Sequence, residues 1–499
     1  MEESLKIDLT QIDFNKYWEM PLSKGAYSEL TDKVRKTRQD FINEYYPSGH
    51  KIYDTTIYPN LWFKIKENSG LGKAIGEKYK DKVAWKEVKR KRISIPIQQD
   101  ATRVILAHIF GNPIVHKDIS PIKSENSQKA MATYKNLWNY YNMDSHIRNF
   151  FGRSLICGDA AFFLTINERK EIVGKTLSFL DGDKLAIKQD IKGEVLEIYR
   201  QYSATNELNE KEVYIDVITQ ESITTYKSGG EFVSQQQLVY SFIPAVYHCR
   251  KDGAWWSFVQ PNIDELEIEL SDLAQDNKSK AKGKYFMSTT TPQKVKLETF
   301  ADSDVFIADR YSDMKFIEPT TMSEAFKYTM EENKEIISHS LGYIFPKVQN
   351  SGDMPTGSMK AQFYPTERIC MEFINEFAPI LDEISWIFQQ LVDALYPELR
   401  IGDVKISSKI KLFSPTDNIS KVTAFADALA KNGATPRSIV NNNPDFFDSD
   451  DEEYLEKLLQ EKLEIDKMRY TNNDYGEDEQ EEMGNENQQI GFHIKGNRE

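Results

Sequence analysis

The sequence predicts an α+β protein in which strand-rich and helical stretches occupy separate parts of the chain. Short β-branched and aromatic runs separated by turn signals fill residues 154–250, as in antiparallel hairpins. Two short segments on either side of residues 283–320 repeat apolar residues every three or four positions, as helices do. Residues 359–397 then hold one apolar face over many helical turns around an internal proline, Pro379.

Length and composition agree with a folded protein of two to four domains. The chain has 499 residues, of which 40% are hydrophobic and 28% charged, so it can bury a large core. The net charge of −15 argues against a protein that coats nucleic acid, because such proteins neutralise phosphates with clustered Lys and Arg. Three distant cysteines without metal spacing predict buried free thiols. The acidic N-terminus predicts no secretory signal, and the longest apolar stretch, residues 104–115, is too short to span a bilayer.

The first half of the chain begins with mixed elements. Residues 93–117 predict a short strand, a helix, and a second strand after a Gly-Asn-Pro turn. Residues 126–150 predict one helix, because Ala130, Tyr134, Leu137 and Tyr141 recur at helical spacing. The antiparallel strands of residues 154–250 follow.

A helical period begins at Asn262, which with Glu265 forms a capping signature. The predicted helix carries a narrow apolar stripe made of Ile263, Leu266, Leu270 and Leu273. Residues 283–320 return to a strand pattern. Thr321 and Glu324 then form a second capping box, and the helix they begin ends at Gly342, a natural hinge.

The remaining elements are a loop, a long helix and a helical C-terminal part. Residues 343–358 contain two prolines, two glycines and no period, so we expect a mobile loop. The long helix starts near residue 359, with Pro365 in its first turns and a kink expected at Pro379. A strand at 404–413 and further helices to residue 470 follow. Residues 471–486 hold seven acidic residues and no Lys or Arg, so the tail 471–499 is predicted to be disordered.

The sequence contains no recognisable catalytic or metal-binding motif. HExxH, paired CxxC, GxSxG and dinucleotide GxGxxG are absent, and the seven histidines are scattered. Gly174-Lys175-Thr176 resembles the end of a phosphate loop, but Arg169 replaces the required earlier glycine, so a hairpin turn is expected. Asp181 and Asp183 could hold a metal, although an Asp-Gly turn is the commoner explanation. We therefore predict no enzyme activity and no cofactor.

Two groups of basic residues remain open to a functional interpretation. The run 89–92 could touch nucleic acid, but a solvated face is the commoner explanation for such runs. The second group is Lys278, Lys280, Lys282 and Lys284, whose spacing of two does not place them on one helical face. They can form a frayed helix end or, if many copies surround an axis, a ring of positive charge. The sequence favours neither reading for these residues.

Several short motifs occur in an order that resembles the portal proteins, or head-to-tail connectors, of long-tailed bacteriophages. The resemblance covers roughly residues 90–470 and rests on the order of its motifs. They are the Gly-x-Pro element in 110–115, the small-residue turn 157–162, Ile243-Pro244, the segment 353–360, and the C-terminal pair 432–436 and 454–458.

The resemblance implies a portal fold and a ring, typically of twelve subunits, at one vertex of the capsid. Its parts would be a wing (1–260 and 359–397), stem helices (261–282 and 321–342), a β-rich clip (283–320), a tunnel loop (343–358) and a helical crown (398–470). The loop residues expected to meet DNA are Lys347, Gln349 and Asn350, with the four lysines above as further channel candidates.

The resemblance also implies partners and a location. The clip would dock terminase and later the head–tail adaptor proteins, and the ring would sit among the major capsid and scaffolding proteins. Double-stranded DNA would pass without sequence specificity, which suits a conduit because twelve copies at −15 would carry about −180. We expect assembly in the host cytoplasm, residence in the virion, and no membrane partner. The competing hypotheses are another head–tail ring protein and a nucleic-acid-processing enzyme.

Overall fold

The computed structural model describes residues 9–21, 33–65, 84–121, 125–167, 169–191, 194–205, 209–238, 240, 242–280, 284–288, 313–317, 323–345, 356–413 and 460. The chain divides into two compact units, Met1–Ser414 and Pro415–Glu499. All the elements named below belong to the first unit. The helices predicted between residues 419 and 470, and the tail 471–499, lie outside the described residues except at residue 460.

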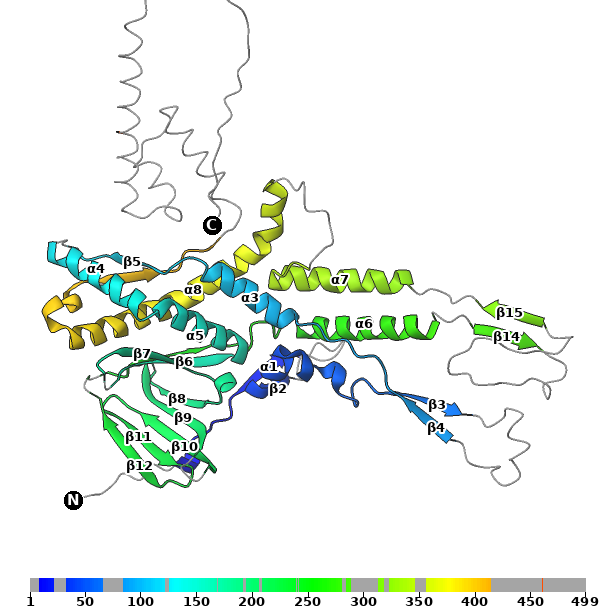
Figure 1. Cartoon of the computed structure of the whole chain (residues 1–499), viewed down its shortest axis with the longest axis horizontal. Helices are drawn as coiled ribbons and strands as arrows, with labels where there is room; N and C mark the ends of the chain where they lie inside the picture. The colour runs from blue at the N-terminus through cyan, green and yellow to red at the C-terminus, as the bar shows by residue number, and fades with distance from the viewer. Residues whose placement is uncertain are drawn as a thin grey trace, which may run out of the picture. The chain divides into compact units, whose positions relative to one another are not determined.

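Four helices contribute a large part of the main core, and Figure 1 shows them around α5 and α8. They are α3 (Ile97–Ile109), α4 (Glu125–Tyr140), α5 (Met143–Cys157) and α8 (Thr356–Leu395). The rings of Phe151 on α5 and Phe377 on α8 stack with their centroids 4.0 Å apart. Tyr134 and Trp138 of α4 pack edge-on against Phe388 of α8. This aromatic packing buries much apolar area and fixes the long helix against the others.

The single helix predicted over 126–150 is wrong, because the structure has two helices there. The chain leaves α4 at Tyr140 and enters α5 at Met143. Asn142 lies between them with φ +50°, in the left-handed region that asparagine tolerates better than most residues. The helical spacing of apolar residues was a correct signal, but it cannot reveal one residue that reverses the backbone. The strand predicted at residue 93 is also wrong, since residues 91–96 belong to no sheet.

Two antiparallel sheets confirm the prediction for residues 154–250. The smaller has the order β13-β6-β7 and the larger β12-β11-β10-β9-β8. A second apolar cluster, including Leu185, Ile198, Ile218 and Phe163, joins them. The strands are β6 (Asp159–Ile166), β7 (Ile172–Leu177), β8 (Lys184–Gln189), β9 (Val195–Thr205), β10 (Lys211–Ile218), β11 (Ser222–Lys227), β12 (Phe232–Gln237) and β13 (Ala245–Cys249).

The hairpin turn predicted at Gly174 is wrong, because Gly174 lies inside strand β7 opposite Leu164. A Cβ at this position would come within 2.8 Å of the Phe162 ring. The glycine therefore makes room for a core aromatic residue rather than for a turn or a phosphate.

The N-terminal part is built from small elements. Helix α1 begins with a capping box in which Thr37 and Asp40 satisfy each other's backbone amides. Its Arg38 is buried and binds both carboxylate oxygens of Asp159, at 2.8 and 2.6 Å. The elements are η1 (Leu9–Gln11), β1 (Tyr17–Pro21), β2 (Lys33–Thr37), α1 (Arg38–Tyr45), η2 (Pro47–Gly49), η3 (Lys51–Tyr53), β3 (Leu61–Ile65) and β4 (Ala84–Val88).

Two further helices and two small sheets complete the unit. Strand β5 pairs with β16 near the end of the unit, inside the predicted strand 404–413. The remaining elements are β5 (Val115–Asp118), η4 (Phe179–Asp181), α6 (Gln260–Lys280), β14 (Lys284–Ser288), β15 (Asp313–Ile317), α7 (Ser323–Leu341), η7 (Pro397–Leu399), η8 (Ile401–Asp403) and β16 (Ile406–Lys409).

Candidate functional site

Helices α6 and α7 lie side by side and form the most distinctive part of the described chain (Figure 1). Their apolar stripes are buried, as predicted, at Ile263 and Leu266 of α6 and at Met330, Ile337 and Leu341 of α7. Asn333 links the pair by donating to Glu269 at 3.2 Å and accepting from Asn262 at 3.5 Å. Burial raises the pKa of the Glu269 carboxyl.

The predicted cap of the first helix is wrong. Helix α6 begins at Gln260, and the amide of Asn262 already donates to Val259 O at 3.0 Å, so Asn262 lies in the first turn. The amide of Gln260 itself bonds to Trp256 O, which starts the helical turn earlier than the polar signature indicated. The second predicted capping box cannot be assessed, because Thr321 lies outside the described residues.

Between the two helices the described chain contains one antiparallel strand pair, β14 and β15. Lys284 pairs with Ile317 and Ser288 with Asp313. The division of residues 261–342 into stem helices and clip stays a prediction.

Gly342 directly follows α7 and packs against α8 under tight steric constraint. Its φ of +59° lies in the left-handed region, and an added Cβ would come within 2.6 Å of Thr366 Cα and 2.9 Å of Thr366 N. The Thr366 hydroxyl donates to Gly342 O. The backbone at the end of α7 therefore rests directly on the backbone of α8, which only glycine permits.

Helix α8 starts earlier than predicted, at Thr356 instead of residue 359, and Pro365 lies inside the helix rather than in its first turn. Pro365 adjoins the Gly342 contact, since its carbonyl carbon would lie 3.2 Å from a Cβ at Gly342. Figure 1 shows the yellow-green start of α8 running in a different direction from its yellow remainder. Pro379 also lies inside α8, at an exposed position, and the kink expected there stays a prediction.

The predicted channel residues fall in different parts of the chain. Lys278 and Lys280 lie in the last turn of α6, and Lys284 is the first residue of β14. The alternating lysines are thus divided between a helix end and a strand. The other candidates, Lys282, Lys347, Gln349 and Asn350, lie outside the described residues. Their proximity to DNA stays a prediction.

The basic run 89–92 is not simply a solvated face, which corrects the interpretation favoured above. The Arg90 guanidinium lies 4.8 Å from the centroid of the Tyr58 ring. Arg92 donates to the carbonyls of Ile52 and Tyr58, both at 3.0 Å. These two arginines fold the chain onto itself, whereas sequence reasoning weighed the run only by its charge.

The residues considered for a metal site do not converge. Asp181 pairs with Arg153 at 2.9 Å, and Asp183 pairs with Arg200 at 2.7 Å. Burial raises the pKa of Asp183, although the Arg200 charge opposes this. Among the residues that the structure describes, no group of three or more His, Cys, Asp or Glu side chains could hold a metal ion.

A Ser-His-Glu arrangement that the sequence did not reveal lies at the junction of α5, β13 and α8. His248 contacts Ser154 Oγ at 2.9 Å through Nδ1 and Glu376 Oε1 at 3.0 Å through Nε2. The Ser154 side chain is 0% exposed and donates to Phe151 O. A catalytic serine needs an accessible hydroxyl, so this cluster instead fastens α8 to β13 and α5. Ser154 and Glu376 lie 94 and 128 positions from His248 in the sequence, so the sequence gives no signal for this cluster.

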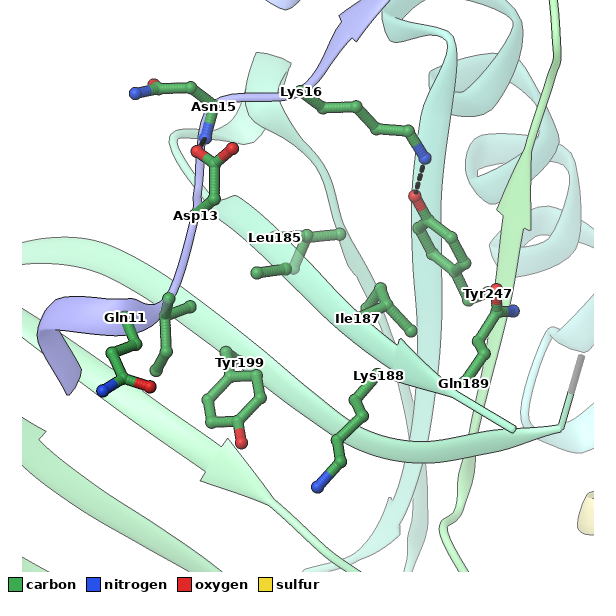
Figure 2. A pocket seen from close by; sticks show the side chains of 12 residues that line it. Gln11, Asp13, Asn15, Lys16, Leu185, Ile187, Lys188, Gln189, Tyr199 and Tyr247 are labelled. Atoms are coloured by element: carbon green, nitrogen blue, oxygen red, sulfur yellow. Dashed lines mark hydrogen bonds between the residues drawn. The ribbon is translucent and has the colours of Figure 1, made fainter. Parts of the chain in front are cut away.

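A cleft of about 610 Å³ lies between residues 11–16 and strands β8 and β9. Figure 2 shows Lys16 reaching Tyr247, to which it donates at 2.9 Å, while the Lys188 side chain points to another end of the cleft. Tyr247 in turn donates to the buried Asp159. Lys16 and Tyr247 therefore fasten the N-terminal segment, whereas Lys188 and Tyr199 both donate to Glu197.

No helix within the described ranges is long and apolar enough to cross a membrane.

Comparison with known proteins gives a matching family and 89 similar chains among solved structures. The family described as "Phage portal protein, SPP1 Gp6-like" matches residues 30–468. A chain from the neck of an empty GTA particle, computed with C6 symmetry, is 11% identical, with a TM-score of 0.41. That alignment covers 68% of this chain and 86% of the other. No curated protein matches the sequence.

Proposed function

Because the chain belongs to the SPP1 Gp6-like phage portal protein family, we propose that it forms the ring through which DNA enters and leaves the capsid. The observation that carries this proposal is the family match over residues 30–468, which includes the α6–β14–β15–α7 arrangement and α8. The ring would consist of identical copies, twelve in the typical case, at one vertex of the virion. Assembly would take place in the host cytoplasm.

Each group of elements would form a different part of the ring. Residues 1–260 and α8 would form the wing, α6 and α7 the stem, and the sheet β14–β15 the core of the clip. Terminase would dock on the clip during packaging, and head–tail adaptors would replace it afterwards. The major capsid and scaffolding proteins would surround the ring during assembly. Residues 398–470 would form the crown.

The channel would contact DNA weakly and without sequence preference. The loop between α7 and α8 has one cation among its polar candidates, Lys347, beside Gln349 and Asn350. Few cations limit the number of phosphates held at one time, and each phosphate contact would slow sliding. Lys278, Lys280, Lys282 and Lys284 would supply a second, sparse set of positive charges.

The family is structural, and we propose no catalysis for this chain. The test is packaging by procapsids assembled with and without the protein, in the presence of the cognate terminase and ATP. We expect nuclease-protected DNA only in particles that contain the chain. Equal protection without it would refute the portal role, and metal-dependent cleavage of DNA by the purified chain would favour an enzyme.

A further inference from the structure

One face of α6 is covered by an extended segment of the same chain. The backbone amides of Ile95, Ile93 and Lys91 donate in turn to Glu267 Oε1 at 2.7 Å, Ser271 Oγ at 2.9 Å and Gln275 Oε1 at 3.2 Å. Two residues of extended chain advance about 6.6 Å, and four residues of helix about 6 Å. Every second residue of the segment therefore meets every fourth residue of α6. Because the residue numbers fall along the segment as they rise along α6, the segment runs antiparallel to the helix and binds each successive turn.

A second layer of contacts reaches the same face from residues 50–58. His50 Nδ1 lies 2.6 Å from Glu267 Oε1, and the two side chains are 0% and 1% exposed. Lys51 pairs with Asp264 at 2.7 Å. The Tyr58 hydroxyl donates to Asp272 at 2.5 Å. Three acidic residues of α6 are thereby bound by the subunit that carries them.

The two covering segments are also tied to each other. Arg92 binds Ile52 O and Tyr58 O, and Arg90 lies over the Tyr58 ring while approaching Asp272 at 3.7 Å. We call residues 50–58 and 90–95 the brace. The brace and α6 share several charge-assisted and buried hydrogen bonds, all of which would have to break together for the two to separate.

Helix α7 presents a contrasting surface. Tyr328 is 67% exposed and Ile336 44%, while the buried side of α7 rests on its partner helix. Directly after α7, Gly342 O accepts a hydrogen bond from the Thr366 hydroxyl of α8. The two helices of the pair are therefore held differently: α6 is bound by a polar ladder in addition to the apolar seam, whereas α7 is held by the seam and by the bonds of Asn333 to α6.

We propose that the brace and α6 form one rigid body that stays closed while the portal works, with Glu267 as the positioning residue at its centre. This inference rests on the proposed function. It assigns a role to residues 50–58, which precede the motifs that carry the resemblance, and it places stem movement at α7. It also means that Asp264, Glu267 and Asp272 face their own subunit rather than DNA or a neighbouring copy.

The decisive experiment locks the brace onto α6 with a disulfide between Ile93→Cys and Ser271→Cys. Ile93 N lies 2.9 Å from Ser271 Oγ, so the two residues are close neighbours, as a disulfide with Cα atoms roughly 4.4–6.8 Å apart requires. Procapsids carrying the double variant are assayed for packaging, oxidised and reduced, beside each single-cysteine variant treated identically. We expect the crosslink to form and packaging to stay within twofold of the reduced particles.

The possible outcomes distinguish a failure of this inference from a failure of the proposed function. If oxidation lowers packaging at least tenfold in the double variant but not in the single-cysteine variants, the brace must open during packaging. Failure of a disulfide to form in folded rings would show that the ladder is not closed. Absence of packaging by wild-type particles would instead count against the portal role itself.

A hydrogen-exchange comparison tests Glu267 and its ladder locally. Ser271→Ala should speed exchange of the Ile93 amide at least tenfold, because the amide loses its acceptor, while Ser271→Thr should restore the slow rate. Glu267→Gln should speed exchange across residues 93–95. Glu265→Gln, the same change at an exposed position of α6, is the matched control and should leave exchange unchanged. Uniform faster exchange over the whole chain would indicate a general loss of stability and contradict a positioning role.

Discussion

At the scale of single residues, Gly342 combines a left-handed backbone with direct contact to another helix. Gly342→Ala should destabilise the protein by about 1–3 kcal/mol, because alanine is strained at this φ and its Cβ would overlap Thr366. Gly229→Ala is the control, since a Cβ there meets nothing within 4 Å. Denaturant midpoints of the two variants test this expectation. An unchanged midpoint for Gly342→Ala would show that Gly342 is not in close contact with Thr366.

Glu376 predicts a pH dependence with a defined sign. Burial would raise the pKa of its carboxyl, but the hydrogen bond from His248 and the Arg250 charge outweigh burial and lower it below 4.5. A lowered pKa means that the stabilisation is complete above the unfolded-state pKa and disappears as the pH falls through the folded-state pKa. Glu376→Gln should therefore cost about 1 kcal/mol at pH 7, a modest value because the side chain is 34% exposed.

The test of Glu376 is thermal unfolding of wild type and variant from pH 7 down to pH 3. The difference in stability should shrink as the pH falls below about 4.5, the ordinary value for a glutamate. Glu372→Gln, an exposed position one turn earlier on α8, should behave like wild type at every pH. A difference that grows toward low pH would contradict the assignment.

Residue-scale chemistry was the part least accessible from sequence. Arg90 and Arg92 read as surface charge, yet their partners Tyr58 and Asp272 lie far away in the chain. The same holds for His248, whose partners come from α5 and α8. Long-range polar pairs leave no periodic trace, so only the folded structure can assign them.

At the scale of elements, α8 depends on its aromatic contacts with α5. Phe377 is fully buried and stacks on Phe151, so Phe377→Ala should cost about 3–5 kcal/mol through lost burial and a residual cavity. Tyr364→Ala, at a position of α8 that is 66% exposed, should cost less than about 1 kcal/mol. Calorimetry of both variants measures the difference, and equal costs would show that α8 is not anchored at Phe377.

Elements were predicted well where apolar periodicity is strong and poorly where a single residue sets a boundary. Helices α6, α7 and α8 and the antiparallel sheets followed from spacing alone. Asn142 divides one periodic stretch into α4 and α5. The hydrogen bond from the Gln260 amide to Trp256 O makes α6 begin before the polar signature at Asn262. Helix ends depend on local hydrogen bonds, which composition does not determine.

At the scale of the whole molecule, the acidic C-terminal tail should be dispensable for folding. Residues 471–499 have too little apolar surface to offset the entropy of ordering. Truncation after residue 470 should leave the melting temperature within about 1 °C, well below the shift that a 1 kcal/mol change produces. A fall of several degrees would show that the tail packs against the folded chain.

The central claim is that identical copies of this chain close around a hollow axis. Electron micrographs of the purified, full-length protein test it most directly. We expect closed rings with a central hole wide enough for a DNA duplex, formed without nucleic acid or a second protein. Stable single subunits, or rings without a hole, would contradict the account.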